Sequence, residues 1–413
     1  MKKNLLLFTD TYPFGNSEQF LEDEIKYLAD AFDTIIIIPL KLGQNRQREI
    51  PSNAVCELSL AKNLSNIRGI FEALFFWPLY VEILHRINNG IHIYEIQRIL
   101  YSARTANLTK KWLSRYIIQN NIRLDNTIFY TYWLTAATFG IGLLKESHPH
   151  LWLVSRAHGY DLYEERYHPP YIPFQKSILG KLNKLFLISE HGEKYILQKY
   201  SALAPICSVA RLGVKGPNIE EVSKYSQDGI FRILSCSFIV PVKRLSLLLE
   251  GISKLAESKP EMSFEWYHIG DGPEKKLLET TAPIKNLSNL KINLIGHLPR
   301  SEVLNFYIFN AIDVFVNVSS SEGIPVSIME AQSYGVPVVA TAVGGNPEIV
   351  SDSNGKLLSS NPSPVEIAES VGSFLANPVS AKLKRIESRK NWENNYNADK
   401  NYAKFVNSLL EIP

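Results

Sequence analysis

The chain of 413 residues lacks the features that mark secreted, membrane-spanning or nucleic-acid-binding proteins. Its three cysteines, Cys56, Cys207 and Cys236, are too scattered for a disulfide framework or a metal-ligand spacing, which fits a reducing compartment. No uncharged apolar run reaches about 18 residues, and the apolar run at the N-terminus is too short for a signal peptide. The net charge of +3 gives no argument for nucleic acid. We therefore expect a cytoplasmic protein without a transmembrane helix.

Short apolar runs alternate with helical patterns along almost the whole chain. This alternation predicts parallel sheets with helices on both faces. Two such series are present and the length suits two domains, so we predict an α/β protein of two doubly wound, Rossmann-like domains. The predicted strands are 4–9, 34–39, 127–132, 151–157, 184–189, 206–211, 230–236, 263–269, 290–295, 312–318 and 337–342. The predicted helices are 18–30, 243–257, 273–281, 300–310, 326–334 and 363–376.

A polar stretch with Gly and Pro at 213–228 is the predicted linker between the domains. It separates an N-terminal domain, 1–212, from a C-terminal domain, 229–378. The tail, 379–413, is expected to form helices that pack back on the N-terminal domain. Ligands of open α/β sheets bind beyond the carboxyl ends of the strands, so the two sheets predict a central cleft.

The stretch 319–339 carries the most informative chemistry. Glu322 lies in the loop before a predicted helix, and Glu330 lies about one and a half turns inside that helix. Free N–H groups at the helix start, those of Val326 and Ser327, form an anion site. Carboxylates beside such a site accept hydrogen bonds from hydroxyl groups, so the arrangement suits a sugar attached to a diphosphate. The alternative is an ordinary helix start with one acid favoured by the helix dipole and one surface acid.

Four motifs in the C-terminal half agree in order and spacing with a known family. They are Val240–Leu245, His268–Pro273, Gly296–Leu298 and the block from Asn317 to Val350. On these motifs the chain resembles the retaining glycosyltransferases of family 4, or group 1, which have the GT-B fold. The N-terminal half is similar more loosely, through Gly15 and Ser155–Tyr163, and resembles the bacterial branch that builds surface or exported polysaccharides. The resemblance implies two facing domains, the first for the acceptor and the second for a nucleotide-sugar.

The resemblance implies a role for each matching residue. Lys243 would contact the donor diphosphate, Glu322 the hydroxyls of the transferred sugar, and Glu330 the ribose hydroxyls. His158 would lie near the sugar, and Gly15 would let the backbone approach the diphosphate. His158 and Glu322 are the expected catalytic residues. The structural alternatives are a solvated lysine, a core histidine and an ordinary turn glycine.

The chain departs from the family at one position. An arginine usually stands five residues before the lysine, and here that position is Phe238. Our hypothesis is that Arg156 or Arg244 supplies the missing diphosphate cation. The rival explanation is weaker donor binding or lost activity. The complete predicted donor-binding set is Gly15, Arg156, Lys243, Arg244, Gly270, Leu298, Glu322, Gly323, Ile324, Val326, Ser327 and Glu330.

Acceptor contacts are expected from Tyr132, Trp133 and Asp161, which lie near predicted strand ends in the N-terminal half. For the two aromatic residues, core packing is the alternative. No Asp-x-Asp pair is placed to hold a divalent ion, and the implied lysine would neutralise the diphosphate instead. We therefore expect no metal and no cofactor other than a UDP- or GDP-linked sugar as the substrate.

The segment 61–115 combines basic and bulky apolar residues. Eight Lys or Arg against three Glu give it a net charge of +5, and it contains Phe75, Phe76, Trp77 and Tyr80. This composition suits an interfacial helix on an anionic membrane, where a polyprenyl-linked acceptor would be found. The alternative is an amphipathic helix packed on the N-terminal sheet with solvated charges around it.

These features together predict a retaining, metal-independent hexosyltransferase. It would move a hexosyl unit from a nucleotide-diphospho-sugar to a hydroxyl of a glycan or lipid-linked glycan, in surface or exopolysaccharide biosynthesis. We expect it in the cytoplasm, peripheral at the inner face of the membrane. Two alternatives stay open: a non-catalytic nucleotide-sugar-binding subunit of the same fold, which Phe238 favours, and a nucleotide-sugar epimerase, which needs no acceptor.

Overall fold

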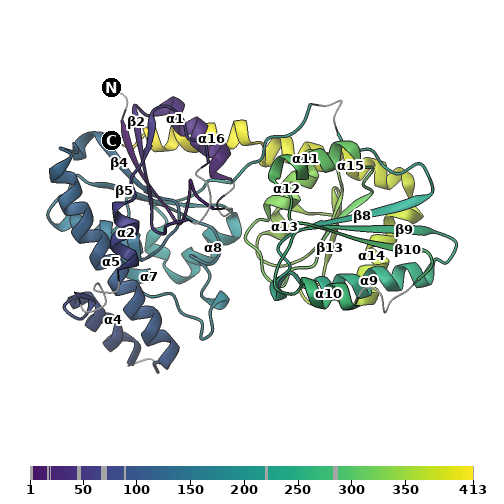
Figure 1. The fold of residues 1–413 in the computed structure, drawn as a ribbon, viewed down its shortest axis with the longest axis horizontal. Coiled ribbons are helices and arrows are strands. Elements are labelled where there is room, and N and C mark those ends of the chain that lie inside the picture. Colours follow the sequence, from purple (N-terminus) through teal and green to yellow (C-terminus); the bar gives the residue numbers. More distant parts are fainter. Residues whose placement is uncertain are drawn as a thin grey trace. The chain divides into compact units, whose positions relative to one another are not determined.

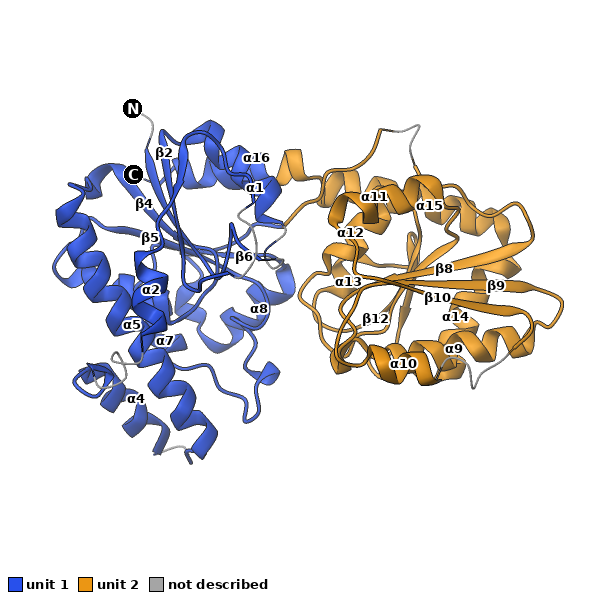
Figure 2. Ribbon diagram, in the orientation of Figure 1, with its two compact units in different colours: residues 1–211, 402–413 blue, residues 212–401 orange. Residues whose placement is uncertain are grey.

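The computed structural model describes residues 3–15, 18, 20–43, 48–66, 72–87, 90–218, 222–281 and 287–412. The chain divides into two compact units (Figure 2). Unit 1 contains residues 1–211 and 402–413, and unit 2 contains residues 212–401. In each unit, helices cover both faces of a parallel sheet (Figure 1).

The sheet of unit 1 has seven strands in the order β3-β2-β1-β4-β5-β6-β7. Apolar residues of β1 alternate between two cores: Leu5 and Leu7 join one cluster, whereas Leu6 and Phe8 join another. A strand buried on both faces is typical of parallel sheets. The strands are β1 (Asn4–Thr9), β2 (Thr34–Pro39), β3 (Ala54–Cys56), β4 (Thr127–Thr131), β5 (Trp152–Ala157), β6 (Lys184–Leu187) and β7 (Cys207–Val209).

The helices of unit 1 include one long element, α5, which packs against α2, α4 and α6. Its Ile99, Trp112 and Leu113 are buried in the core on one face of the sheet. The helices are α1 (Leu21–Ala31), α2 (Ser59–Ser65), α4 (Trp77–Ile87), α5 (Ile93–Gln119), α6 (Ala136–Gly142), α7 (Gln175–Leu179) and α8 (Glu190–Lys199).

The sheet of unit 2 has six strands in the order β10-β9-β8-β11-β12-β13. The chain order reverses at β8, whose neighbours are β9 and β11, and such a switch point is where open α/β sheets bind ligands. The strands are β8 (Ile230–Cys236), β9 (Ser263–Ile269), β10 (Leu290–Gly296), β11 (Val314–Asn317), β12 (Val338–Thr341) and β13 (Gly355–Leu358). The helices of this unit are α9 (Leu245–Ser258), α10 (Lys275–Thr281), α11 (Arg300–Phe309), α12 (Val326–Ser333), α13 (Asn346–Ile349), α14 (Pro364–Ala376) and α15 (Pro378–Asn395).

The C-terminal helices, 379–413, which we expected to pack back on the N-terminal domain, are divided between the units. Helix α15 packs on α12 and α14 of unit 2. The last residues, in helix α16 (Ala398–Leu410), place Phe405 and Leu409 in the core of unit 1. No helix among the described residues is long and apolar enough to cross a membrane.

The predicted alternation of strands and helices is observed with small shifts of the ends. Strands β1, β2, β8 and β9 have the predicted bounds. The prediction missed β3 and β13, which have three and four residues, because such short runs carry little periodicity. It also missed α5 as an element, since its 27 residues mix apolar and charged groups with only a weak stripe.

Candidate functional site

The centre of the candidate site in unit 2 is an ion pair between Lys243 and Glu322. The Lys243 Nζ lies 2.5 Å from the Glu322 Oε1, although 79 residues separate the two in the chain. Lys243 ends a 3-10 turn, Pro241–Lys243, that follows β8, and Glu322 follows β11. Because β8 and β11 are neighbouring parallel strands, both side chains lie at their carboxyl ends.

Glu322 is held ionised by its surroundings. Its side chain is 9% exposed, and the Asn317 Nδ2 donates to the Glu322 Oε1 at 3.1 Å. Burial would raise the pKa of Glu322, but the Lys243 charge and hydrogen bonds from Ser319 and Asn317 hold the pKa below its usual value. The result is a nearly buried carboxylate whose main partner is a single side-chain cation.

The loop after Glu322 approaches a second loop closely. The Gly345 N–H donates to the Gly323 carbonyl at 2.8 Å, and a Cβ at Gly344 would lie 2.0 Å from the Glu322 carbonyl oxygen. Gly344 has φ +54, which favours glycine as well. Helix α12 then begins after Pro325, so the N–H groups of Val326 and Ser327 lie in its first turn, where a helix supplies no carbonyl partner.

Glu330 lies within α12 and pairs with a cation that the sequence analysis did not include. The Arg300 Nε lies 3.2 Å from the Glu330 Oε1, and both side chains are mostly buried. Arg300 begins α11, directly after the Gly296–Leu298 turn. The signal that could have identified Arg300 was its position after that turn, at the carboxyl end of β10.

The turn after β9 is closely packed against the end of β8. Gly270 has φ +146, and a Cβ there would lie 1.8 Å from the Ser237 carbonyl oxygen. Its N–H donates to the Gly296 carbonyl at 2.8 Å, which joins this turn to the one that contains Leu298. Burial lowers the pKa of the neighbouring His268 to about 4, so this imidazole is neutral near pH 7. The loops that follow β8, β9 and β10 therefore lie together.

The hypothesis that Arg244 replaces the missing diphosphate cation does not fit the structure. Arg244 has φ +50 and its guanidinium donates to the carbonyl oxygens of Val318, Ser319 and Ser360. Its donors are thus used to hold loops. Phe238, at the position of the family's arginine, is 64% exposed and presents an aromatic ring instead of a charge.

The parallel hypothesis for Arg156 does not fit either. Arg156 is fully buried in unit 1, 2.5 Å from Glu24, and donates to the Ala210 carbonyl at 2.9 Å. The ring of Phe405, from the C-terminal helix, covers its guanidinium at 4.3 Å. Strand β5 directs this side chain toward the core because α16 covers that face, so Arg156 ties the C-terminus to the sheet.

The loop after β1 in unit 1 is organised by Glu18, which the sequence analysis did not select. Its carboxylate accepts the N–H groups of Asp10, Thr11 and Tyr12 at 2.7–2.8 Å, and the Trp133 Nε1 at 2.7 Å. Gly15 lies in the same loop with φ +68, as a turn requires. The backbone donors next to β1 are therefore already used by an internal carboxylate.

His158 lies in an aromatic cluster at the end of β5. Its ring centroid is 4.3 Å from that of Trp133 and 4.6 Å from that of Tyr132. The His158 Nδ1 is 3.5 Å from the Asp161 Oδ2, and its Nε2 has no hydrogen-bond partner among the described residues. Both ring nitrogens are buried, so packing in the aromatic cluster holds this ring.

Two of the predicted acceptor residues have internal roles. Asp161 accepts the N–H groups of Leu134, His158 and Gly159 at 2.8–3.1 Å, so its oxygens hold loops. Burial would raise the pKa of Asp161, but its hydrogen bonds and the His158 charge hold the pKa below its usual value. Tyr132 is fully buried, as the core-packing alternative predicted, and burial raises its pKa. Trp133 remains partly exposed.

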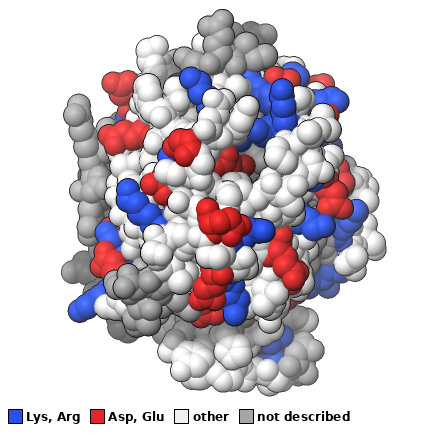
Figure 3. All heavy atoms as spheres, turned by 90° about the vertical axis from the view of Figure 1, so that its right-hand side faces the viewer, with Lys and Arg blue, Asp and Glu red and all other residues white. Residues whose placement is uncertain are grey.

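The charges of the described surface are mixed in sign. On the face drawn in Figure 3, acidic and basic side chains are interspersed. Among the described residues, no group of three or more His, Cys, Asp or Glu could hold a metal ion.

Comparisons with known proteins agree with this geometry. Residues 220–398 match the model of the family described as glycosyl transferases group 1. The chain is 27% identical over 193 residues to a Streptococcus agalactiae protein, the GtfA subunit of UDP-N-acetylglucosamine--peptide N-acetylglucosaminyltransferase. It is also 27% identical over 211 residues to the putative colanic acid biosynthesis glycosyltransferase WcaL of Escherichia coli K12. These matches support a group 1 glycosyltransferase.

The matched regions cover 46% and 49% of this chain, and the chain spans 36% and 50% of those two relatives. Solved structures are similar over nearly the full length. Anabaena Alr3699/HepE, crystallised with UDP, has a TM-score of 0.65 at 15% identity, covering 99% of this chain and 100% of its own. TarM has a TM-score of 0.69 at 16% identity, covering 98% of both chains. The fold is GT-B.

Proposed function

We propose that this protein is a retaining hexosyltransferase that uses a nucleotide-diphospho-sugar. The acceptor is a hydroxyl of a glycan or lipid-linked glycan in surface or exopolysaccharide biosynthesis. The observation that carries the proposal is the Lys243–Glu322 pair at the carboxyl ends of two neighbouring strands, beside the first turn of α12. A cation, a buried carboxylate and free helix N–H groups together recognise a sugar on a diphosphate.

The chemistry follows from charge. The leaving nucleoside diphosphate gains negative charge in the transition state, and donors already aimed at that charge supply much of the rate acceleration. Lys243 and the N–H groups of Val326 and Ser327 supply these donors, while Glu322 accepts hydrogen bonds from the sugar hydroxyls. Glu330, oriented by Arg300, holds the ribose. The resemblance also implies that His158 lies near the sugar, although both its ring nitrogens are buried in unit 1.

A thermal-shift panel with UDP, GDP, ADP and CMP tests the donor site. UDP is the first candidate because similar solved structures were crystallised with it. A nucleotide at about 100 times its dissociation constant stabilises the protein by roughly 2.7 kcal/mol. We expect only one of the four nucleotides to raise the melting temperature. The rise should be the same in magnesium and in EDTA, and Glu330→Ala should abolish it. Glu257→Ala, which removes an exposed acid from α9, is the matched control.

The transfer step is tested with the preferred nucleotide linked to a hexose and a mixture of short glycan acceptors. Mass spectrometry detects the added hexose, and proton NMR of the new anomeric centre reports retention. Hydrolysis or transfer that stops in EDTA would contradict metal independence. Inversion at the anomeric carbon would contradict the retaining mechanism.

A second candidate is a non-catalytic nucleotide-sugar-binding subunit. The observation that favours it is the shortage of cations: Phe238 replaces an arginine, and Arg156 and Arg244 are both used elsewhere. Nucleotide binding without transfer or hydrolysis would support this candidate. Acceptor-free conversion of the nucleotide-sugar would instead support an epimerase.

A further inference from the structure

Helix α4 has apolar side chains on two of its faces. Trp77, Val81 and Leu84 recur at helical spacing and are 49–72% exposed. On the inner side, Glu82 accepts the Phe174 N–H at 2.6 Å, and Arg86 pairs with Glu95 of α5 at 2.8 Å. A surface helix normally turns its apolar stripe to the core. In α4, Leu79 and Ile83 pack on the core as expected, and a second apolar stripe faces outward.

The exposed apolar surface continues beyond α4. It includes one side chain just before the helix and two at the start of α5, which packs against α4 (Figure 1). We call it the apolar face, and it is formed by Phe75, Trp77, Val81, Leu84, Ile93 and Tyr94. Phe75 is 91% exposed. Such a concentration of large apolar groups on a surface marks an interaction site.

Several of the basic side chains in this region have partners within the protein. Of the cations counted in 61–115, Arg86 pairs with Glu95 and Lys111 pairs with Glu72. Arg104 is buried and donates to two backbone carbonyls. These ion pairs leave the net charge of the segment unchanged, because both glutamates are already counted in it. Membrane binding depends on the apolar area that is inserted as well as on charge.

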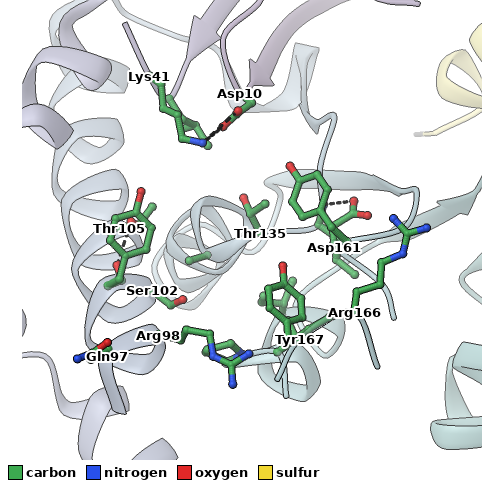
Figure 4. Close-up of a pocket in the computed structure, with 18 of the residues that line it drawn as sticks. Asp10, Lys41, Gln97, Arg98, Ser102, Thr105, Thr135, Asp161, Arg166 and Tyr167 are labelled. Carbon is green, nitrogen blue, oxygen red and sulfur yellow. Dashed lines mark hydrogen bonds and ion pairs between the residues drawn. The ribbon is translucent and has the colours of Figure 1, made fainter. Parts of the chain in front are cut away.

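A cavity of about 680 Å³ opens beside the apolar face. It lies at the carboxyl ends of the central strands of unit 1 and has α5 as one wall (Figure 4). Tyr94 and Tyr101 line the cavity and are also exposed by 57% and 60%. Because Tyr94 belongs to both the cavity and the apolar face, one ligand can occupy both.

The cavity has a surplus of positive charge. In the view of Figure 4, Arg98 and Arg166 lie on either side of Tyr167. Neither arginine forms an ion pair with any described carboxylate; Arg98 donates to the Pro169 carbonyl, and its buried Nε has no partner among the residues described. The two acids of the cavity are compensated, Asp10 by Lys41 at 2.9 Å and Asp161 by backbone N–H groups. Anionic ligands are therefore favoured.

We infer that unit 1 binds an acceptor in which a phosphate joins a sugar to a long apolar chain. The cavity takes the sugar, with Arg98 and Arg166 on the phosphate. The apolar face takes the chain and rests on the bilayer surface, where Trp77 and Tyr80 lie at the interface as such side chains prefer. This inference names the acceptor of the transferase proposed above and rests on that proposal.

Vesicle co-sedimentation of the full chain tests the apolar face. We expect binding to phosphatidylglycerol–phosphatidylcholine vesicles that is only partly lost at high salt. Phe75→Ser with Trp77→Ser should reduce the partition coefficient by roughly tenfold or more. Phe309→Ser is the matched control, because Phe309 is 80% exposed on α11 of unit 2. Equal binding by all variants, or no binding at all, would overturn the inference.

The cavity is tested with farnesyl diphosphate, pyrophosphate and farnesol in the same thermal-shift assay. We expect the amphiphile to shift the melting temperature more than either fragment. Arg98→Gln and Arg166→Gln should each weaken its binding about tenfold, and Lys176→Gln on α7 is the control. Equal shifts with pyrophosphate alone would mean that the cavity is a free-phosphate site, which would overturn the lipid assignment.

Two further outcomes separate this inference from its rivals. A dimer in light scattering that Phe75→Ser with Trp77→Ser dissociates would assign the apolar face to a second copy and overturn the lipid proposal. UDP binding must persist in every variant of unit 1. If the wild-type protein binds the amphiphile but neither binds UDP nor transfers a sugar, the proposed function alone is refuted. If it binds UDP and transfers a sugar but does not bind the amphiphile, the acceptor assignment alone is refuted.

Discussion

Two acids of the candidate site in unit 2 and two acids of the loops in unit 1 have different partners. In unit 2, Glu322 and Glu330 face the side-chain cations Lys243 and Arg300. In unit 1, Glu18 and Asp161 each accept three backbone N–H groups. A side-chain cation can turn toward an arriving ligand, whereas a backbone donor leaves only if its loop opens. Acids of similar burial thus face side-chain cations where we propose donor recognition, and hold loops together in unit 1.

The largest expected effect tests the architectural side of this comparison. Arg156→Met removes one partner of a buried pair and leaves Glu24 charged in the core of unit 1. Breaking such a pair costs about 3–5 kcal/mol. Urea unfolding should show this loss, while Arg123→Met, which removes an exposed pair with Asp125, should leave the midpoint unchanged. Similar midpoints for both variants would refute an architectural role for Arg156.

The next effect tests the recognition side. Lys243→Ala removes the cation from the Glu322 carboxylate and from the site of the leaving diphosphate. We expect kcat/KM to fall by roughly 10²–10³, since single preorganised donors of developing charge contribute that much. Lys254→Ala, at an exposed position on α9, is the control. A loss below threefold in steady-state kinetics would exclude Lys243 from transition-state stabilisation.

Much of the fold could be predicted from the sequence, because apolar runs of strand length are separated by Gly- and Pro-containing turns. The long-range pairs could not. Arg156 lies between Ser155 and Ala157 in a strand, where its polarity suggests a solvent-facing position. Its burial depends on Phe405, which lies about 250 residues later and packs over its guanidinium. Local sequence patterns carry no information about packing by a residue so distant in the chain.

The candidate site likewise has residues that the sequence predicts and residues that only the structure reveals. The loop and helix that carry Glu322 and Glu330 were predictable from a turn followed by an apolar helix pattern. Glu18 was not, because its role depends on φ +57 and on loop N–H groups that converge on its carboxylate. Spacing in the sequence identifies groups that share one element, whereas partners from different elements require the structure.

A gain of affinity sharpens the comparison further. Phe238→Arg would restore a second cation near Lys243, where the structure has only an exposed ring. We expect about tenfold tighter UDP binding by calorimetry, with unchanged affinity for uridine, because the added charge interacts with phosphate alone. Phe309→Arg, on another exposed phenylalanine of unit 2, should leave UDP binding unchanged. Equal affinity in Phe238→Arg would show that the diphosphate does not lie near this position.

The smallest effect concerns the cation that the sequence analysis missed. Arg300→Gln keeps a hydrogen-bond donor near Glu330 but removes the charge that orients it. If Glu330 holds the ribose, the wild-type protein binds UDP more tightly than 2′-deoxy-UDP, and Arg300→Gln should reduce that preference about fivefold. Glu330→Ala should remove the preference and leave the Arg300 substitution without further effect, because coupled residues are not additive. An unchanged preference in Arg300→Gln would mean that Arg300 supports only the packing of α11 and α12, and that Glu330 is positioned by its own helix.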